Sequence, residues 1–206
     1  MHVLLINGSP HEKGCTYTAL SLVAGELNAA GITTEILNVG TKPVGGCIGC
    51  GGCAKGNGCV FGGVVNEAIE KARTADAFVF GTPVHYASAS GNMTSFLDRL
   101  AYAGGKYLAY KPAAICASAR RAGTTSALDQ LVKYPEFFHM PLVSGSYWPM
   151  VHGSSPEQVL QDEEGCAVMK ELGRNMAWLL QCIEAGKAAG ISHPENPRRP
   201  MTNFIR

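Results

Sequence analysis

The sequence predicts an α/β fold, in which a doubly wound parallel sheet of five strands carries helices on both faces. Short apolar runs rich in β-branched and aromatic residues alternate with longer amphipathic segments along the chain. Strands that alternate with helices pair in parallel through right-handed crossovers. The 206 residues are enough for one such domain with a substantial core. The chain shows no internal repeat or low-complexity segment, so one domain is expected.

The first half of the chain predicts two strands and two helices around a long loop. Asn7-Gly8-Ser9-Pro10 is a turn signal that ends the first strand. Apolar residues then recur at helical spacing until Gly31, which closes the first helix. In order, the predicted elements are a strand at residues 3–6, a helix from 15 to 30, a strand at 33–37, a Gly- and Cys-rich loop at 40–63 and a helix near 65–75.

The second half continues the alternation. The apolar run at 77–80 ends at Gly81-Thr82-Pro83 and is typical of a strand buried on both faces. We place the domain at residues 1–186 and expect an extended tail at 187–206, either part of the same domain or packed on a partner subunit. The predicted elements are strands at 77–80, 113–117 and 142–147 and helices at 90–103, 124–134 and 163–185.

Composition excludes several classes of protein. Apolar residues make up 46% of the chain and charged residues 16%, which excludes a disordered or coiled-coil chain. A net charge of +1 gives little electrostatic support for a nucleic-acid or anionic-membrane partner. No apolar run approaches the roughly 18 residues of a membrane helix, and the first residues lack the basic region of a signal peptide. We therefore expect a cytoplasmic protein.

Eight cysteines divide into a cluster and four scattered residues. In a reducing compartment a disulfide framework is not expected, so the cluster predicts metal binding or redox activity. The scattered cysteines are expected to be mostly buried small hydrophobes. The cluster is Cys47, Cys50, Cys53 and Cys59, and the scattered residues are Cys15, Cys116, Cys166 and Cys182.

The loop between the first strand and the first helix has the features of a phosphate site. Its glycines allow close turns, its hydroxyls can donate, and the helix that follows adds free N–H groups and a partial positive charge. An ordinary loop with a Thr cap is the alternative. The sequence excludes three other phosphate loops. Gly14-Cys15 stands where a Walker loop has Gly-Lys, and Gly8-Ser9-Pro10 breaks the Gly-x-Gly-x-x-Gly dinucleotide fingerprint. A Cys-x5-Arg phosphatase loop needs a nearby arginine, but the first arginine of the chain is Arg73.

Three stretches together resemble the flavodoxin-like NAD(P)H-dependent FMN reductase family. Gly8-Ser9-Pro10 with Gly14-Cys15-Thr16 is similar to the family's FMN phosphate loop, and the closing Thr202–Arg206 is similar to tails in the family. The other two stretches are the cysteine cluster and residues 81–86, which continue to 90–93 and 96–99. The resemblance implies the strand order 2-1-3-4-5, FMN as cofactor, NAD(P)H as reductant and a homodimer or homotetramer.

The resemblance also implies which residues bind the flavin. Residues 83–86 would form the ring-binding loop, and the loop after the fourth strand would approach the O2/N1 edge of the flavin. Three alternatives remain: His85 as a hydrogen-bonded structural residue, Tyr86 as a packing residue, and Thr124 as the cap of a solvated loop. The implied cofactor-binding residues are Ser9, His11, Gly14, Cys15, Thr16, Pro83, Val84, His85, Tyr86, Ser118, Arg120 and Gly123, and no catalytic acid or base is assigned.

The spacing of Cys47, Cys50, Cys53 and Cys59 is compact enough for four thiolates to ligate one metal centre. Thiolate-only ligation suits a 4Fe–4S cluster or zinc. The spacing resembles the cluster motif of the iron–sulfur flavoproteins. A metal-free loop of reduced thiols is the alternative, and zinc comes third because its structural sites usually pair two Cys hooks across a longer loop.

Two further features have structural interpretations. Asp98-Arg99 predicts a structural ion pair or a subunit contact, and Trp148 a core residue or a cover for a partner's flavin. For the whole chain we expect an FMN-dependent oxidoreductase that takes hydride from NAD(P)H and passes electrons to a flavin, quinone, azo or nitro compound, or protein. An electron carrier of the iron–sulfur flavoprotein type and a metal-binding or regulatory module are the alternatives.

Overall fold

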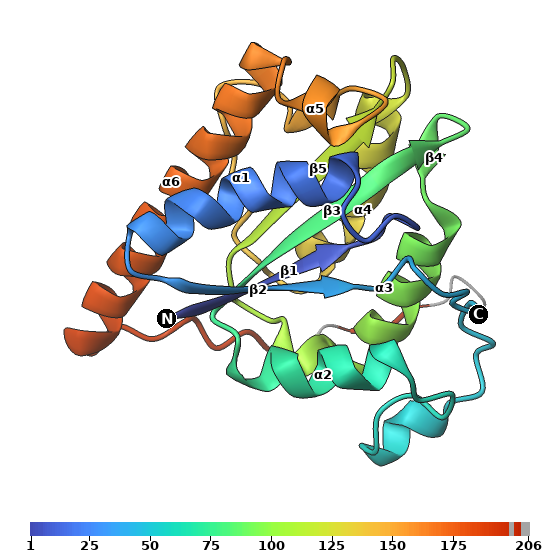
Figure 1. Ribbon diagram of the computed structural model, residues 1–206. Helices are drawn as coiled ribbons and strands as arrows, with labels where there is room; N and C mark the ends of the chain where they lie inside the picture. Colours follow the sequence, from blue (N-terminus) through green and yellow to red (C-terminus); the bar gives the residue numbers. More distant parts are fainter. Residues whose placement is uncertain (198–199, 203–206) are drawn as a thin grey trace.

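A parallel sheet runs through the middle of the molecule and is covered by helices on both faces (Figure 1). The computed structural model describes residues 1–197 and 200–202. Five strands pair in parallel, and a short sixth strand, β4 (Ser88–Ala89), pairs antiparallel with the end of β3. Their order confirms the flavodoxin-like order expected above: β2 (Thr33–Asn38), β1 (His2–Asn7), β3 (Ala77–His85), β5 (Ala113–Ala119) and β6 (Met150–His152).

Two apolar clusters hold the helices to the sheet. Alternate side chains of a strand point to opposite faces, so Val3 and Leu5 belong to one cluster and Leu4 and Ile6 to the other. Burial on both faces explains the continuous apolar runs in the central strands β1, β3 and β5. One face carries α1 (Cys15–Ala29), α5 (Pro156–Val159) and α6 (Glu163–Ala188), and the other carries α2 (Val64–Thr74), α3 (Gly91–Gly104) and α4 (Thr124–Phe137). Two short 3-10 helices, η1 (Gly52–Lys55) and η2 (Gly105–Tyr107), lie in the connections.

The predicted fifth strand at 142–147 is wrong. Only Leu142 forms an isolated bridge, to Ala113, and the strand that pairs with β5 is β6. After Val143 the chain leaves the sheet edge, because the N–H and hydroxyl of Ser146 bond the Glu171 carboxylate at 2.8 and 2.6 Å. Pairing resumes at Met150.

The last helix and the segment after it differ in detail from the expectation. The helix α6 runs to Ala188, three residues beyond its predicted end at 185. Beyond it, the His193 ring stacks on the Tyr110 ring with centroids 4.2 Å apart, and Asn196 Nδ2 donates to the Tyr110 hydroxyl at 2.6 Å. Residues 203–206, which carry most of the closing resemblance, lie outside the described part. None of the described helices is long and apolar enough to cross a membrane.

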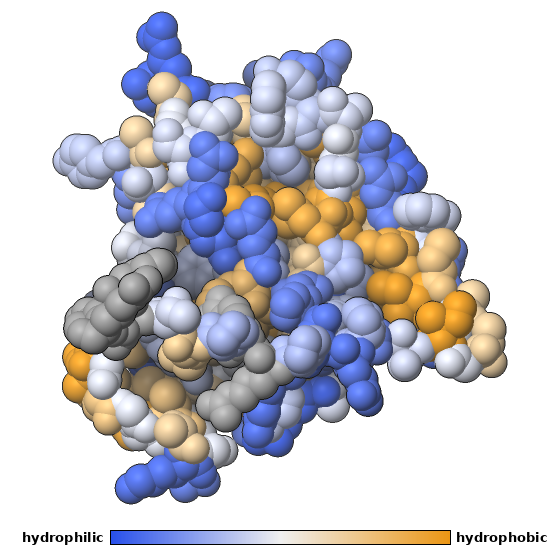
Figure 2. Space-filling model, turned by 180° about the vertical axis from the view of Figure 1, so that it is seen from behind, coloured by the Kyte–Doolittle hydropathy of each residue, from blue (hydrophilic) through white to orange (hydrophobic). Residues whose placement is uncertain are grey.

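Several residues expected in the core are exposed. Trp148 is 58% exposed, so its expected place in the core is wrong. Among the scattered cysteines, Cys116 and Cys166 are buried, Cys15 is half-buried and Cys182 is exposed. Figure 2 shows apolar patches among polar residues on the face seen from behind. Such patches are available for contact with another surface.

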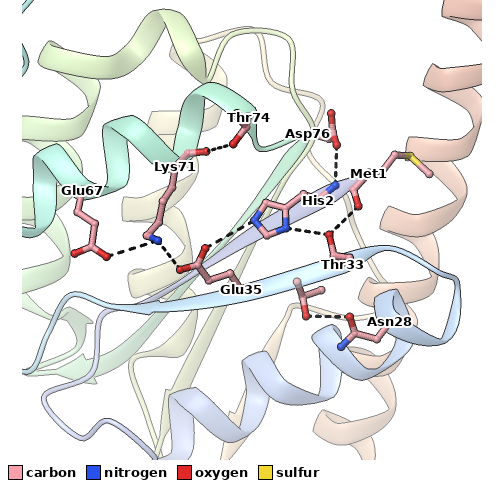
Figure 3. Close-up of polar contacts among 10 residues, drawn as sticks. Met1, His2, Asn28, Thr33, Glu35, Glu67, Lys71, Thr74 and Asp76 are labelled. Carbon is pink, nitrogen blue, oxygen red and sulfur yellow. Dashed lines mark hydrogen bonds and ion pairs between the residues drawn. The ribbon is translucent and has the colours of Figure 1, made fainter.

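A polar network ties β1, β2 and α2 together near the amino ends of the strands (Figure 3). Lys71 Nζ lies 2.7 Å from a Glu35 carboxylate oxygen and 3.7 Å from one of Glu67. The hydrogen bond to Glu35 raises the pKa of the Lys71 ammonium group. The backbone N–H of His2 donates to Asp76 at 2.7 Å. These contacts belong to the end of the sheet opposite the loops described next, and they serve the fold.

Candidate functional site

Three loops meet at the carboxyl edge of the sheet, where ligands of doubly wound folds bind. The first turn of α1, which follows the loop after β1, contacts the end of β5 through the hydroxyls of Thr16 and Ser118, which lie 2.8 Å apart. The Ser90 hydroxyl at the start of α3 donates to the Gly8 carbonyl at 2.9 Å. The fold therefore brings the three predicted flavin-binding stretches together.

Asn7, the last residue of β1, shapes the first loop. Its side chain is fully buried. Its Nδ2 donates to the Glu12 carbonyl at 3.2 Å and to Asn38 Oδ1 at 2.8 Å, and its Oδ1 accepts from the Ser9 N–H at 3.1 Å. The sequence analysis used Asn7 only as part of a turn signal. A polar side chain at the end of a buried strand needs hydrogen-bond partners, and this position could have predicted the role of Asn7 in the loop.

The helix α1 begins with open hydrogen-bond donors. Its N-cap is Gly14, which supplies no side-chain cap, and its first turn holds no acidic residue. Among residues 1–197 and 200–202, the backbone N–H groups of Cys15 and Thr16 have no hydrogen-bond acceptor on another residue. The alternative of an ordinary loop with a Thr cap is therefore wrong, because α1 has no side-chain cap and the Thr16 hydroxyl faces Ser118. Free N–H groups and the helix dipole at one point can hold a phosphate.

The other predicted residues of this loop differ in their roles. The Ser9 hydroxyl is buried and accepts from the His11 N–H at 3.1 Å, which leaves its own proton free to donate. The His11 side chain is exposed. The Cys15 thiol donates to the Gly153 carbonyl at 3.6 Å, and burial raises its pKa. Cys15 is thus a neutral thiol that joins α1 to the end of β6.

The end of β3 presents two exposed side chains. Pro83 and Val84 are half-buried, whereas His85 and Tyr86 are exposed, Tyr86 by 105%. Neither alternative role is confirmed: Tyr86 does not pack, and the imidazole of His85 has no hydrogen bond among the residues that the structure describes. Tyr86 and Ala87 have φ of +48° and +60°, which forms the tight turn into β4.

The loop after β5 packs closely against this turn. Gly123 has φ +93°, and a Cβ there would lie 2.6 Å from Ala87 Cα and 2.9 Å from Val84 Cγ1. Only glycine fits both the backbone and the space. Gly123 is itself the N-cap of α4, so the alternative in which Thr124 caps this helix is wrong. The Thr124 hydroxyl bonds the sulfur of Met150 at 3.1 Å. Ser118 is buried and Arg120 exposed.

A hollow lies between the first loop, the end of β3 and the start of α3. Its volume is about 370 Å³, within the usual range of ligand pockets. Asn92 fixes its far wall: Nδ2 donates to the carbonyls of Gly40 and Lys42 at 2.9 and 3.1 Å, and Oδ1 accepts from the Val44 N–H at 3.1 Å. The hollow is lined by Gly8, Pro10, Val44, His85, Ser90, Gly91, Asn92 and Ser95.

Gly40 lies against the backbone of Gly8 and Ser9 in the first loop, and this close contact gives a prediction. A Cβ at Gly40 would overlap the carbonyl oxygens of Gly8 and Ser9. We expect Gly40→Ala to lower the free energy of unfolding by about 1–3 kcal/mol, the usual cost of overpacking, and to weaken FMN binding. Thermal denaturation and flavin titration measure the two effects. Gly46→Ala is the matched control, because its Cβ would meet only the Ser95 hydroxyl at 3.8 Å; equal results for the two variants would contradict this support.

The four clustered cysteines line one cavity in the loop that follows β2. This loop projects from the body of the molecule below α3 (Figure 1), and the cavity holds about 260 Å³. Cys47 and Cys50 are exposed, and Cys53 and Cys59 are half-buried. Within the described residues no three His, Cys, Asp or Glu side chains are arranged to hold a metal ion. The donor set is therefore that of a thiolate metal site, but the sulfurs are not drawn together around one point.

Asp98 and Arg99 do not pair with each other, so the predicted ion pair is wrong. The Asp98 carboxylate accepts from the Tyr134 hydroxyl at 2.6 Å, and Arg99 faces the cysteine cavity. Successive residues of a helix point in different directions, which explains why neighbours in sequence reach α4 and the cysteine loop respectively.

Comparison with known proteins identifies the family. Residues 1–155 match the model of the family described as NADPH-dependent FMN reductase. The chain belongs to this family. A flavodoxin from the domain Archaea superposes with a TM-score of 0.60 at 12% identity, over 88% of this chain and 99% of that one, in agreement with the flavodoxin-like fold.

The chain is also similar to archaeal proteins described as iron–sulfur flavoproteins, of which two match most of its length. The one from Archaeoglobus fulgidus is 30% identical over 175 residues, which cover 83% of this chain and 86% of that protein. The one from Methanocaldococcus jannaschii is 26% identical over 192 residues, which cover 89% of this chain and all of that protein. The protein is therefore an FMN reductase-family oxidoreductase with iron–sulfur flavoproteins among its relatives.

Proposed function

We propose that the protein is an FMN-dependent oxidoreductase that takes hydride from NAD(P)H and passes the electrons to a second acceptor. The acceptor would be a flavin, a quinone, an azo or nitro compound, or a protein. The observation that carries this proposal is the uncapped start of α1, because its open N–H groups belong to the same strand-to-helix segment as the buried residues Ser9 and Thr16. These groups suit the phosphate of FMN, and the joined loops after β3 and β5 suit its ring.

The chain's own part in the reaction is to bind and orient. Bound FMN supplies the hydride-accepting chemistry and can release electrons singly or in pairs. The N–H groups of Cys15 and Thr16 would hold the phosphate, and the turn at Pro83–Tyr86 would border the ring. The exposed Arg120 and the Ser118–Gly123 loop would stabilise negative charge at the O2/N1 edge. No side chain needs to move a proton in the first half-reaction.

We also propose that Cys47, Cys50, Cys53 and Cys59 hold a 4Fe–4S cluster. The cavity that all four line and the iron–sulfur flavoprotein relatives support this proposal. Since the sulfurs are not gathered around one point, binding would draw the glycine-rich loop together; Gly49, Gly51 and Gly56 all have positive φ there. A cluster would add a one-electron carrier to the flavin. A purely regulatory metal module is less favoured, because it would leave the three joined loops without a role.

The setting of this activity is also proposed. We expect a cytoplasmic homodimer or homotetramer, and the exposed apolar side chains of Phe61, Tyr86 and Tyr102 are available for subunit contacts. No nucleic acid or membrane is expected as a partner. Purified protein should be yellow and carry about one FMN per chain. Colourless protein that also fails to bind added FMN would contradict the proposed function.

His85 is expected to contribute little to the chemistry, although it lines the hollow. We expect His85→Ala to lower the rate of flavin reduction by NAD(P)H by less than about a hundredfold, the lower range of a true acid–base role. Stopped-flow absorbance of the flavin measures this rate. A larger loss would assign His85 to proton transfer or to binding of the nicotinamide.

A further inference from the structure

We infer that Arg99 is the positioning residue of the cysteine loop: it ties the two ends of the loop together and places a positive charge beside the proposed thiolate-bound cluster. This inference rests on the proposed cluster and adds a residue that the cysteine motif does not contain.

The guanidinium group of Arg99 bonds the loop at three points. Its Nε donates to the Cys59 sulfur at 3.2 Å, its Nη1 to the Gly45 carbonyl at 3.3 Å and its Nη2 to the Gly62 carbonyl at 3.1 Å. Gly45 precedes the first cysteine of the motif, and Gly62 follows the last. One rigid fork on α3 thus closes the segment that holds all four cysteines.

Arg99 is buried without an acidic partner. Arg99 is only 6% exposed, and among the described residues no carboxylate lies within ion-pair distance of its guanidinium group. The adjacent Asp98 is bonded to Tyr134 instead. The Phe61 ring, 5.4 Å from the guanidinium carbon, offers only a weak cation–π contact. A buried cation is costly unless an anion accompanies it, so the cavity beside Arg99 favours an anionic occupant.

A cluster held by four thiolates meets that requirement. Its ligands bring negative charge to the sulfurs that line the cavity, and Cys59 already accepts a hydrogen bond from Arg99. Hydrogen bonds to cluster sulfurs and nearby positive charge favour the reduced, more negative state of the cluster. Arg99 would therefore both assist assembly and make the cluster easier to reduce.

Lysine and glutamine separate these two effects. Arg99→Lys keeps the charge but replaces the planar fork by a compact ammonium group, which does not reproduce the three bonds to Cys59, Gly45 and Gly62. Arg99→Gln removes the charge. Arg73→Gln is the control, because Arg73 is a more exposed arginine on α2 that pairs with Glu70. All proteins are purified anaerobically from iron-supplied cells, and FMN and iron per chain are measured.

Wild type and Arg73→Gln are expected to hold about four irons per chain. Both Arg99 variants should retain FMN and lose at least threefold in iron. At the potential where the wild-type cluster is half reduced, the reduced-to-oxidised ratio should fall about tenfold in Arg99→Gln, which is about 59 mV for one electron. In Arg99→Lys the ratio should stay within about threefold of wild type, because the charge is kept.

Each other outcome overturns a stated part of the inference. Wild-type iron in Arg99→Lys would contradict the closing of the loop, and an unchanged ratio in Arg99→Gln would contradict the charge effect. Loss of FMN from both variants would assign Arg99 to the fold and overturn the inference. If wild-type protein holds FMN but no iron, the proposed cluster fails and this inference with it. If the wild-type protein holds iron and both Arg99 variants match it in iron content and in the reduced-to-oxidised ratio, the inference about Arg99 fails while the proposed cluster stands.

Discussion

Cys53→Ala is expected to abolish iron binding while the protein keeps its FMN. Cys53 is the third of the four cysteines in the motif. The cavity that it lines shares no lining residue with the hollow beside the first loop, which would hold the FMN phosphate. A 4Fe–4S cluster needs four ligands, so removal of one thiolate from so compact a motif should prevent assembly. Iron and FMN per chain, measured after anaerobic purification, test this expectation. Wild-type protein should be brown and bleach when dithionite is added.

The matched control for this variant is Cys182→Ala, because Cys182 is exposed on α6 and belongs to the opposite face of the sheet from α3. It should leave both iron and FMN unchanged. Full iron in Cys53→Ala would exclude Cys53 as a ligand. Wild-type protein that is iron-free under these conditions, yet still oxidises NAD(P)H, would establish a flavin reductase without a cluster.

Ser9→Ala combined with Thr16→Ala should weaken FMN binding at least tenfold, with the fold retained. Both residues are buried in the segment that leads into the uncapped start of α1. A hydrogen bond to a charged group contributes about 1.5–3 kcal/mol, so loss of one such bond already produces this change. Flavin fluorescence titration measures the affinity, and circular dichroism checks the fold.

Thr74→Ala is the control for the double variant, since the Thr74 hydroxyl is exposed at the end of α2 and bonds only the Lys71 carbonyl among the described residues. Its FMN affinity should equal that of wild type. If the double variant also binds FMN as wild type does, the phosphate lies elsewhere in the molecule.

The strand order could be predicted because burial on both faces makes each central strand a continuous apolar run. The run at 77–80 and the run at 113–117 both lie within observed strands, β3 and β5. The edge strand β6 was missed because it has three residues and its pattern is weak, while the apolar Leu142 and Val143 nearby gave a stronger signal. Which residues form the edge strand depends on the edge of the sheet and on the hydrogen bond from Ser146 to Glu171, which draws the chain away from it. Local periodicity in the sequence shows neither.

The candidate site also contains residues that the sequence could place and residues that it could not. Ser9, Gly14 and Gly123 stand in short turn motifs, so the local sequence was sufficient to place them at the carboxyl edge of the sheet. Arg99 and Asn92 act through contacts to residues 54 and 52 positions away, Gly45 and Gly40. Pairings over such distances follow from the fold, and the sequence alone suggested the nearer partner Asp98 for Arg99.

The measurement that tests the central claim most directly is an anaerobic titration of the purified protein with NADH and, separately, NADPH. The absorbance of the bound flavin is followed at each addition. We predict that one of the two nucleotides bleaches the flavin fully at about one molecule per FMN, apart from electrons taken up by any cluster, and that admission of a quinone restores the colour. Flavin that stays oxidised in excess of both nucleotides would contradict the proposed hydride transfer.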